Sequence, residues 1–315
     1  MHDNIVTRKH VGHWIARYKR AGVERTCSAM GCDVYGDDWT TLRQWITNPL
    51  VINQGRPMPN HYIIGDFSRF DISHSRWKIT RMMDVVAAGC EDPELVHNIG
   101  HAMANYMVRY DGRVVRVPRG LPSGCQMTTV LNCLLNTALW ATVWRKCVGK
   151  DFSHFQQNTR LLVYGDDVVF AMSQNSPYNK CVTPERVQQV MASLGYELTS
   201  SDDGPLRWVD LPDVVFLKRH FVIDACDRLL THAPRPLEEV WTQLHWCRKD
   251  LSPEEVRVAF INAAHEFGQH GPDVIKEAWK TLKKAVRVSG VYERALVASN
   301  FRALAHAAWT HSLPP

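Results

Sequence analysis

Two adjacent aspartates lie between two short apolar runs in the stretch Leu161-Leu162-Val163-Tyr164-Gly165-Asp166-Asp167-Val168-Val169-Phe170. Apolar runs of this length, separated by a glycine-containing turn, predict two strands joined by a tight hairpin turn. Neighbouring carboxylates at a hairpin tip repel each other unless a cation neutralises them. Because hard oxygen ligands favour magnesium or manganese, Asp166 and Asp167 form a candidate metal site.

The same four letters of the turn occur earlier in the chain, at Tyr35-Gly36-Asp37-Asp38. No apolar run precedes this first copy, and the mixed segment Trp39-Thr40-Thr41-Leu42 follows it. We therefore predict a helix start here, with Asp37 or Asp38 capping free backbone N–H groups. Only the second copy has the strand context that a hairpin metal site requires, so the chemistry is assigned to that copy.

Composition sets broad limits on the class of protein. The chain has 315 residues, of which 45% are apolar and 22% charged, as is ordinary for a soluble globular protein of one or two domains. The formal net charge of +5 permits a polyanionic partner without requiring one. Nine scattered cysteines, with no Cys-x-x-Cys pair, predict reduced thiols in a cytosolic protein. No apolar stretch approaches the length of a membrane span, and a signal-peptide core is lacking.

Hydrophobic periodicity predicts alternating strands and helices in the middle of the chain. Strands are expected over residues 61–67, 113–117, 161–163, 168–170, 214–217 and 220–223, and helices over residues 73–88, 93–109, 123–144 and 184–194. Thr183 and Pro184 are suited to the cap and first turn of the last of these helices. After Pro234-Arg235-Pro236 the pattern becomes wholly helical, so we place a domain boundary there. The elements around the hairpin resemble a split β-α-β-β-α-β unit.

A third aspartate ends the strand predicted over residues 61–67. This residue is Asp66, and Asp71 follows five residues later in Asp66-Phe67-Ser68-Arg69-Phe70-Asp71. A carboxylate at this strand end, next to the Asp166 hairpin, would complete a cage of three aspartates. Two metal ions held about 4 Å apart by shared carboxylates suit in-line phosphoryl displacement.

A glycine-rich loop precedes the long helix predicted over residues 123–144. Its sequence is Gly120-Leu121-Pro122-Ser123-Gly124-Cys125, and Thr128 and Asn132 follow. Ser123 is expected to cap the helix, and Asn132 returns to roughly the same helical face. Such a helix can present serine, threonine and asparagine side chains towards a nucleotide sugar.

Four segments, in this order and approximate spacing, resemble the motifs of viral RNA-dependent RNA polymerases, and most of all those of picornavirus-like viruses. They are Asp66 to Asp71, the loop 120–124 with Asn132, Tyr164-Gly165-Asp166-Asp167, and Phe216-Leu217-Lys218-Arg219. The resemblance implies an α+β fold with a right-hand polymerase palm, which has an antiparallel sheet, backing helices and a ferredoxin-like core. An all-helical thumb follows, and the fingers are largely absent. The implied ranges are 1–60 for a partial fingers or connecting region, 61–233 for the palm and 234–315 for the thumb.

The resemblance also implies roles for the matching residues. Catalysis and metal binding fall to Asp66, Asp166 and Asp167. Recognition of the nucleotide and its ribose falls to Asp71, Ser123, Thr128 and Asn132. Contacts with RNA fall to Gly120, Gly124, Lys218 and Arg219. A site that pairs the 2′-hydroxyl of a ribonucleotide penalises a deoxynucleotide, because the polar groups of the site are then left unpaired.

Two features depart from the family pattern. A lysine proposed as the general acid for pyrophosphate usually follows the helix near residue 195, whereas Asp203 stands at the matching position here. An aspartate that is ionised at neutral pH donates a proton poorly. The basic segment that grips the triphosphate in relatives has no match before Asp66, so the chain looks like the palm and thumb of a larger polymerase.

The expected activity is template-dependent RNA synthesis by two-metal nucleotidyl transfer, in the replication and transcription of a viral RNA genome. The implied cofactor is Mg²⁺, for which Mn²⁺ can substitute. The implied partners are RNA template and primer, ribonucleoside triphosphates and other viral replication proteins, in host cytoplasm at membrane-associated replication complexes. Two alternatives stay open: a non-catalytic RNA-binding fragment, and a reverse transcriptase, although the latter usually has a bulky aromatic residue where Asp71 stands.

Overall fold

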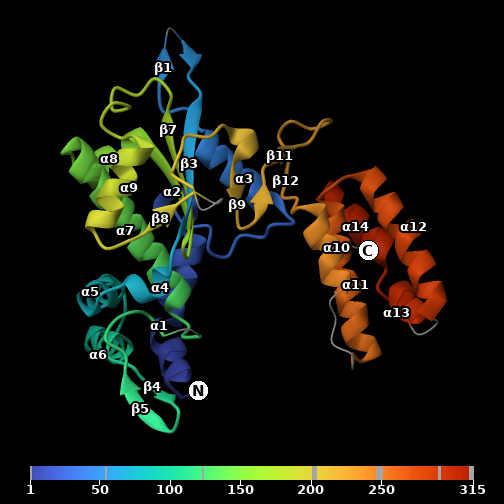
Figure 1. Ribbon diagram of the computed structural model, residues 1–315, viewed down its shortest axis with the longest axis horizontal. Coiled ribbons are helices and arrows are strands. Elements are labelled where there is room, and N and C mark those ends of the chain that lie inside the picture. The colour runs from blue at the N-terminus through green and yellow to red at the C-terminus, as the bar shows by residue number, and fades with distance from the viewer. Residues whose placement is uncertain are drawn as a thin grey trace. The chain divides into compact units, whose positions relative to one another are not determined.

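The computed structural model describes residues 2–53, 55–122, 124–200, 204–245, 251–289 and 292–311 (Figure 1). The chain divides into two compact units. Unit 1 comprises Met1–Gly31 and Trp45–Leu211, and unit 2 comprises Cys32–Gln44 and Pro212–Pro315. Each unit is thus built from two separate stretches of sequence.

The centre of unit 1 is a four-stranded sheet in the order β6-β7-β3-β8. Its strands are β3 (Asn60–Phe67), β6 (Thr159–Tyr164), β7 (Asp167–Ser173) and β8 (Leu198–Thr199), and all neighbours are antiparallel. The apolar residues of the two central strands are buried on both faces, which explains why they read as continuous apolar runs. The predicted strand ending near Asp66 and the hairpin around Asp166 are both confirmed.

Helices surround this sheet in unit 1. They are α1 (His2–Arg20), α2 (Val23–Thr26), α4 (Phe70–Ser73), α5 (Arg76–Ala87), α6 (Pro93–Ala104), α7 (Thr128–Val148), α8 (Phe152–Asn158) and α9 (Pro184–Ser193). Figure 1 shows α7, α8 and α9 beside the strands, where they cover one face of the sheet. Thr183 caps α9 and Pro184 begins it, as the sequence predicts.

Two small hairpins complete unit 1: β1 (Ile52–Asn53) with β2 (Arg56–Pro57), and β4 (Met107–Tyr110) with β5 (Arg113–Arg116). The predicted helix over residues 93–109 is wrong at its end, because the helix stops at Ala104. The turn Asp111-Gly112 has positive φ at both residues and turns the chain back, so Tyr110 pairs with Arg113. The preceding residues therefore join a strand instead of extending the helix.

The long helix also begins later than predicted. It starts at Thr128 and not at residue 123, and it continues to Val148. Gly120 and Gly124 both have positive φ, which a right-handed helix does not accommodate. The loop therefore stays irregular up to the start of α7, and Ser123, the predicted cap, lies outside the described residues.

Unit 2 is mainly helical in its C-terminal part, as predicted. Its elements are α3 (Asp37–Thr47, whose last turn belongs to unit 1), the 3₁₀ helix Leu211–Asp213 (whose first residue belongs to unit 1), β9 (Val215–Phe216), β10 (Arg219–His220), β11 (Val222–Ile223), β12 (Thr231–His232), α10 (Leu237–His245), α11 (Pro253–Gly268), α12 (Pro272–Ser289), α13 (Tyr292–Ala298) and α14 (Phe301–Thr310). The predicted second hairpin exists as β9 and β10, but β11 pairs with β12.

The first copy of the repeated tetrad begins α3, so the predicted helix start is confirmed. Asp38 accepts a hydrogen bond from the backbone N–H of Asp33 at 2.8 Å, which closes the loop before the helix. Trp39 is fully buried in unit 2, where its ring stacks on Phe221 and its Nε1 donates to the carbonyl of His220. The predicted ranges of palm and thumb stay predictions, and the structure adds that residues 32–44 pack with the C-terminal stretch.

Candidate active site

The strand register brings the predicted catalytic aspartates to one end of the sheet in unit 1. Gly65 of β3 pairs with Val168 of β7, so Asp66 follows directly beside the point where Asp167 begins β7. Asp166 occupies the turn between β6 and β7. Residues separated by a hundred positions in sequence thus become neighbours because the two strands are antiparallel.

The electrostatics of this end of the sheet are unfavourable for three negative charges. Asp166 keeps contact with solvent, yet desolvation by the surrounding protein raises the pKa of its carboxyl group. The negative charges of Asp71 and Asp66 raise this pKa further. Like charges that stand this close together favour the uptake of a cation or a proton.

The donor set at this site fits a divalent metal ion. Carboxylate oxygens are hard ligands of the kind that magnesium and manganese bind, and Asp66, Asp166 and Asp167 supply them from adjoining strands. Across the described ranges, no three His, Cys, Asp or Glu side chains are already gathered closely enough to hold an ion. The strand register brings the three donors to one end of the sheet.

Helix α7 supports the turn of the hairpin through two buried side chains that the sequence reasoning missed. Asn136 donates from Nδ2 to the carbonyl oxygens of Gly165 at 3.1 Å and Asp166 at 3.3 Å. The backbone N–H of Gly165 donates to Sγ of Cys133 at 3.2 Å. The position of Asn136 could have been predicted from its spacing, because it lies one helical turn after Asn132 and therefore on the same face of α7.

The predicted ribose-recognition residues are brought together in part. Asn132, on α7, donates from Nδ2 to Oδ1 of Asp71, on α4. The hydroxyl of Thr128 donates to the carbonyl of Pro122 at 2.8 Å, which assigns it to holding the loop. Ser123 and Asp203 lie outside the described residues.

The two glycines of the loop differ in their surroundings. Gly120 has φ +96°, and a Cβ atom there would lie 2.8 Å from Cα of Ile72. The backbone N–H groups of Gly120 and Leu121 donate to the carbonyls of His74 and Asp71. Gly124 has φ +81° but open space around it. Gly120 therefore permits close packing of the loop on α4, while Gly124 serves only the backbone conformation.

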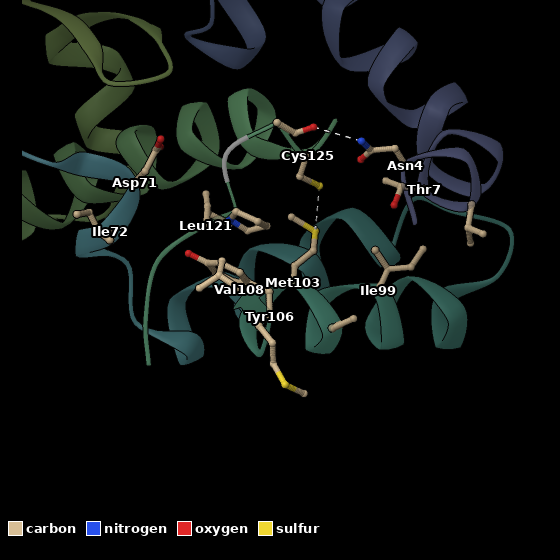
Figure 2. Close-up of a pocket in the computed structure, with 15 residues that line it drawn as sticks. Asn4, Thr7, Asp71, Ile72, Ile99, Met103, Tyr106, Val108, Leu121 and Cys125 are labelled. Carbon is tan, nitrogen blue, oxygen red and sulfur yellow. Dashed lines mark hydrogen bonds between the residues drawn. The ribbon is translucent and has the colours of Figure 1, made fainter. Parts of the chain in front are cut away.

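A cavity of about 770 Å³ lies beside this loop. Figure 2 shows Asp71 at one side of it, and Leu121, Met103 and Cys125 among its mostly apolar lining. Asn4 of α1 donates to the carbonyl of Gly124 at 3.2 Å, so it ties the loop to the first helix. The cavity thus borders the predicted nucleotide site at one residue, Asp71.

The two residues of unit 2 that were predicted to bind RNA, Lys218 and Arg219, differ in their exposure to solvent. Lys218 is exposed at the tip of the β9–β10 turn, with φ 59°. Arg219 is 7% exposed, and its guanidinium makes a two-pronged ion pair with Glu266 at 2.6 and 3.0 Å. It also donates to the carbonyl of Ala233. The expectation that Arg219 contacts RNA is therefore corrected, since its charge is used inside unit 2.

The sequence was compared with models of known protein families. A family model described as viral RNA-dependent RNA polymerase matches residues 4–294. The chain belongs to this family. The motif resemblance found in the sequence is thereby confirmed.

Similar sequences of this polymerase family occur in polyproteins of RNA viruses. The RNA1 polyprotein of Tomato ringspot virus (isolate raspberry) is 28% identical over 273 residues, which cover 84% of this chain and 12% of the polyprotein. The genome polyprotein of Human rhinovirus 16 is 24% identical over 283 residues, which cover 88% of this chain and 12% of the polyprotein. The chain thus spans about an eighth of the length of these relatives.

A solved structure supports the fold of the polymerase chain. The Sicinivirus 3Dpol RNA dependent RNA polymerase superposes with a TM-score of 0.67 at 18% sequence identity. The match covers 90% of this chain and 56% of the solved one. The predicted α+β fold of a polymerase palm with an antiparallel sheet and helices is confirmed by this likeness.

Proposed function

We propose that this chain is the catalytic portion of a viral RNA-directed RNA polymerase that copies the viral RNA genome from a template. The observation that supports the proposal most is the register of β3 and β7, which puts Asp66 next to Asp166 and Asp167 in a chain of this family. Asp66 and Asp167 come from the two central strands of the sheet, and Asp166 comes from the turn directly before β7.

In this proposal Asp66 and Asp166 hold Mg²⁺, for which Mn²⁺ can substitute, and Asp167 supports them. The bound ions would activate the attacking hydroxyl and neutralise the charge that develops on the leaving pyrophosphate. Asn136 and Cys133 hydrogen-bond to the backbone of the turn, so that the carboxylates of Asp166 and Asp167 extend from a fixed backbone. A fixed backbone keeps the geometry of the donors constant through the reaction.

Selection of ribonucleotides falls to Asp71 and Asn132 in this proposal. Their side chains already bond to each other, and both are polar groups that a 2′-hydroxyl can join. A deoxynucleotide leaves this pair without its third partner, which costs binding energy. Reverse transcriptases usually have a bulky aromatic side chain at this position, which excludes the 2′-hydroxyl. Residue 71 of this chain is an aspartate instead.

Lys218 and the loop between Gly120 and Gly124 are proposed to contact the RNA primer and template. Lys218 supplies an exposed cation at a turn, and phosphate contacts of this kind position RNA without reading its sequence. Ribonucleoside triphosphates and other viral replication proteins complete the proposed partners. The proposed location is the host cytoplasm, at membrane-associated replication complexes. In the described parts of the chain, none of the helices is long and apolar enough to cross a membrane.

Primer extension tests the proposal. The 315-residue chain is supplied with a primed RNA template, manganese and ribonucleotides, and compared with Asp166→Ala. Extension that Asp166→Ala abolishes is the expected result. The matched control is Asp38→Ala, which alters the same tetrapeptide in unit 2 and should leave extension intact.

Two other results would redirect the assignment. Retained RNA binding without any extension would favour a non-catalytic RNA-binding fragment. Extension with deoxynucleotides in preference to ribonucleotides would favour a reverse transcriptase.

A further inference from the structure

His74 lies at the C-terminal end of α4, and its side chain is fully buried in unit 1. Its Nε2 is 3.0 Å from Oδ1 of Asn132, and its Nδ1 is 3.0 Å from the hydroxyl of Tyr196. Asn132 in turn donates to Asp71. The four side chains therefore form a continuous hydrogen-bonded chain that ends at the proposed ribose site.

The direction of each hydrogen bond in this chain follows from its end at Asp71. A carboxylate only accepts, so the amide of Asn132 must turn Nδ2 towards Asp71 and Oδ1 towards His74. Oδ1 also only accepts, so His74 must carry its proton on Nε2. Nδ1 is then left as the acceptor for the hydroxyl of Tyr196. Each of the three bonds then joins one donor to one acceptor, and the second N–H of Asn132 is left for a further partner.

The imidazole of His74 is held in place by its neighbours. The ring of Phe70 meets it edge-on with centroids 4.5 Å apart, and the carbonyl of His74 accepts the backbone N–H of Gly120 at 2.8 Å. Burial lowers the pKa of His74 to about 4, so the ring is neutral near pH 7 and has a single N–H to donate. The ring thus has one tautomer that satisfies both partners.

We infer that His74 is a positioning residue for sugar selection, which fixes the amide of Asn132 so that its N–H groups face Asp71 and the incoming ribose. The inference rests on the proposed function, and it adds a residue that touches neither nucleotide nor metal. Without the donor at Nε2, Oδ1 of Asn132 would be buried without a partner, and the bond to Asp71 alone would hold the amide.

Three variants separate positioning from packing. His74→Phe keeps the ring and removes both nitrogens, whereas His74→Gln keeps one amide donor and one acceptor in the same place. The matched control is His61→Phe, which removes another imidazole from unit 1. The ring of His61 stacks on that of Trp208 with centroids 3.5 Å apart, whereas the hydrogen bond to Asn132 is made by His74. The first readout is the ratio of kcat/KM for a ribonucleotide to that for the matching deoxynucleotide.

We expect His74→Phe to lower this ratio about three- to tenfold, the size of one lost hydrogen bond, mainly through a higher KM for the ribonucleotide. His74→Gln should restore most of the ratio, and His61→Phe should not change it. An unchanged ratio in His74→Phe, with wild-type extension present, would overturn the inference and leave the proposed function standing. So would a His74→Phe ratio that falls no further than that of His61→Phe.

The second readout does not depend on activity. Nitrogen-15 NMR of the wild-type chain reports the tautomer of His74 and the exchange rate of the side-chain amide protons of Asn132. An Nε2–H tautomer, with Asn132 amide protons that His74→Phe releases to faster exchange, supports the positioning of Asn132 by His74 even if the chain fails to extend a primer. An Nδ1–H tautomer would overturn it whatever the activity.

Discussion

Asn136 donates a hydrogen bond from its Nδ2 to the carbonyl oxygen of Gly165, 3.1 Å away, in the turn that presents Asp166. The same nitrogen also reaches the carbonyl of Asp166, and Cys133 accepts the N–H of Gly165. The polar backbone groups of this turn are thus satisfied by one face of α7. Local sequence provides the turn, but a helix from another part of the chain fixes it.

Asn136→Leu should weaken both folding and extension. The substitution leaves the buried carbonyl of Gly165 and the partly buried carbonyl of Asp166 without their donor, which costs about 1–3 kcal/mol of unfolding free energy. The loss should fall at the low end, because Oδ1 of Asn136 is itself buried without a partner among the described residues. Urea unfolding measures the first effect and primer extension the second. Asn158→Leu, which removes a donor to His154 far from the turn, should lower stability without lowering extension per folded molecule.

Arg219 and Lys218 should respond to substitution in different ways although they are neighbours. Arg219→Met leaves the charge of Glu266 buried and unpaired, so the free energy of unfolding should fall by about 3–5 kcal/mol. Adding Glu266→Gln should recover part of this loss. Lys218→Ala should leave stability unchanged and reduce only RNA affinity, most clearly at low salt. Fluorescence-monitored urea unfolding and filter binding of primed RNA report the two quantities. Equal stability losses for both residues would contradict the assignment.

Acid should destabilise the chain partly through His74. Its pKa is about 4 in the folded chain and 6.5 ordinarily, so the unfolded state binds more protons between these values. The contribution of His74 to the free energy of unfolding is therefore fully present above pH 6.5. It is lost as the pH falls towards 4, and the loss is roughly 3 kcal/mol for this one residue. Urea unfolding at pH 7.5, 6 and 5 should show a shallower acid loss for His74→Gln than for wild type. Parallel curves would show that His74 ionises equally well in both states.

Gly120→Ala and Gly124→Ala form a matched pair. Both place a side chain at positive φ, which costs roughly 1–2 kcal/mol. Only the Cβ atom at residue 120 meets backbone, at Ile72 and Asp71, so the first variant must also displace the loop from α4. We expect Gly120→Ala to reduce ribonucleotide incorporation strongly and Gly124→Ala to reduce it little. Steady-state extension rates compare them, and similar losses would mean that conformation alone matters.

Short-range pattern was sufficient for the central strands and for most helices of this chain. The strand 61–67 and the Asp166 hairpin followed from apolar runs, and the start of α9 followed from Thr183 and Pro184. The failures lie where distant segments decide. Residues 107–110 have helical neighbours in sequence, but they pair with the strand that returns after Asp111-Gly112.

The candidate site shows the same division between local and distant information. Asp66, Asp71, Asn132 and Asp166 could be proposed from the sequence because their motifs are local and ordered. The roles of His74 and Asn136 depend on contacts between α4, α7 and the hairpin turn, which no spacing rule reveals. Arg219 was misassigned because a basic residue at a hairpin has the same sequence signature whether it faces solvent or a buried glutamate.

The two-part composition of unit 2 has a consequence for the order in which the chain folds during its synthesis. Tyr35 donates to Glu266, and the ring of Trp39 stacks on Phe221, so the early segment 32–44 finds these partners only after about 180 to 230 further residues have been synthesised. Unit 1 can acquire its sheet while the ribosome is still producing the C-terminal helices. Until Phe221 is synthesised, the ring of Trp39 lacks the aromatic ring on which it stacks in unit 2, so a large apolar side chain stays uncovered in the growing chain.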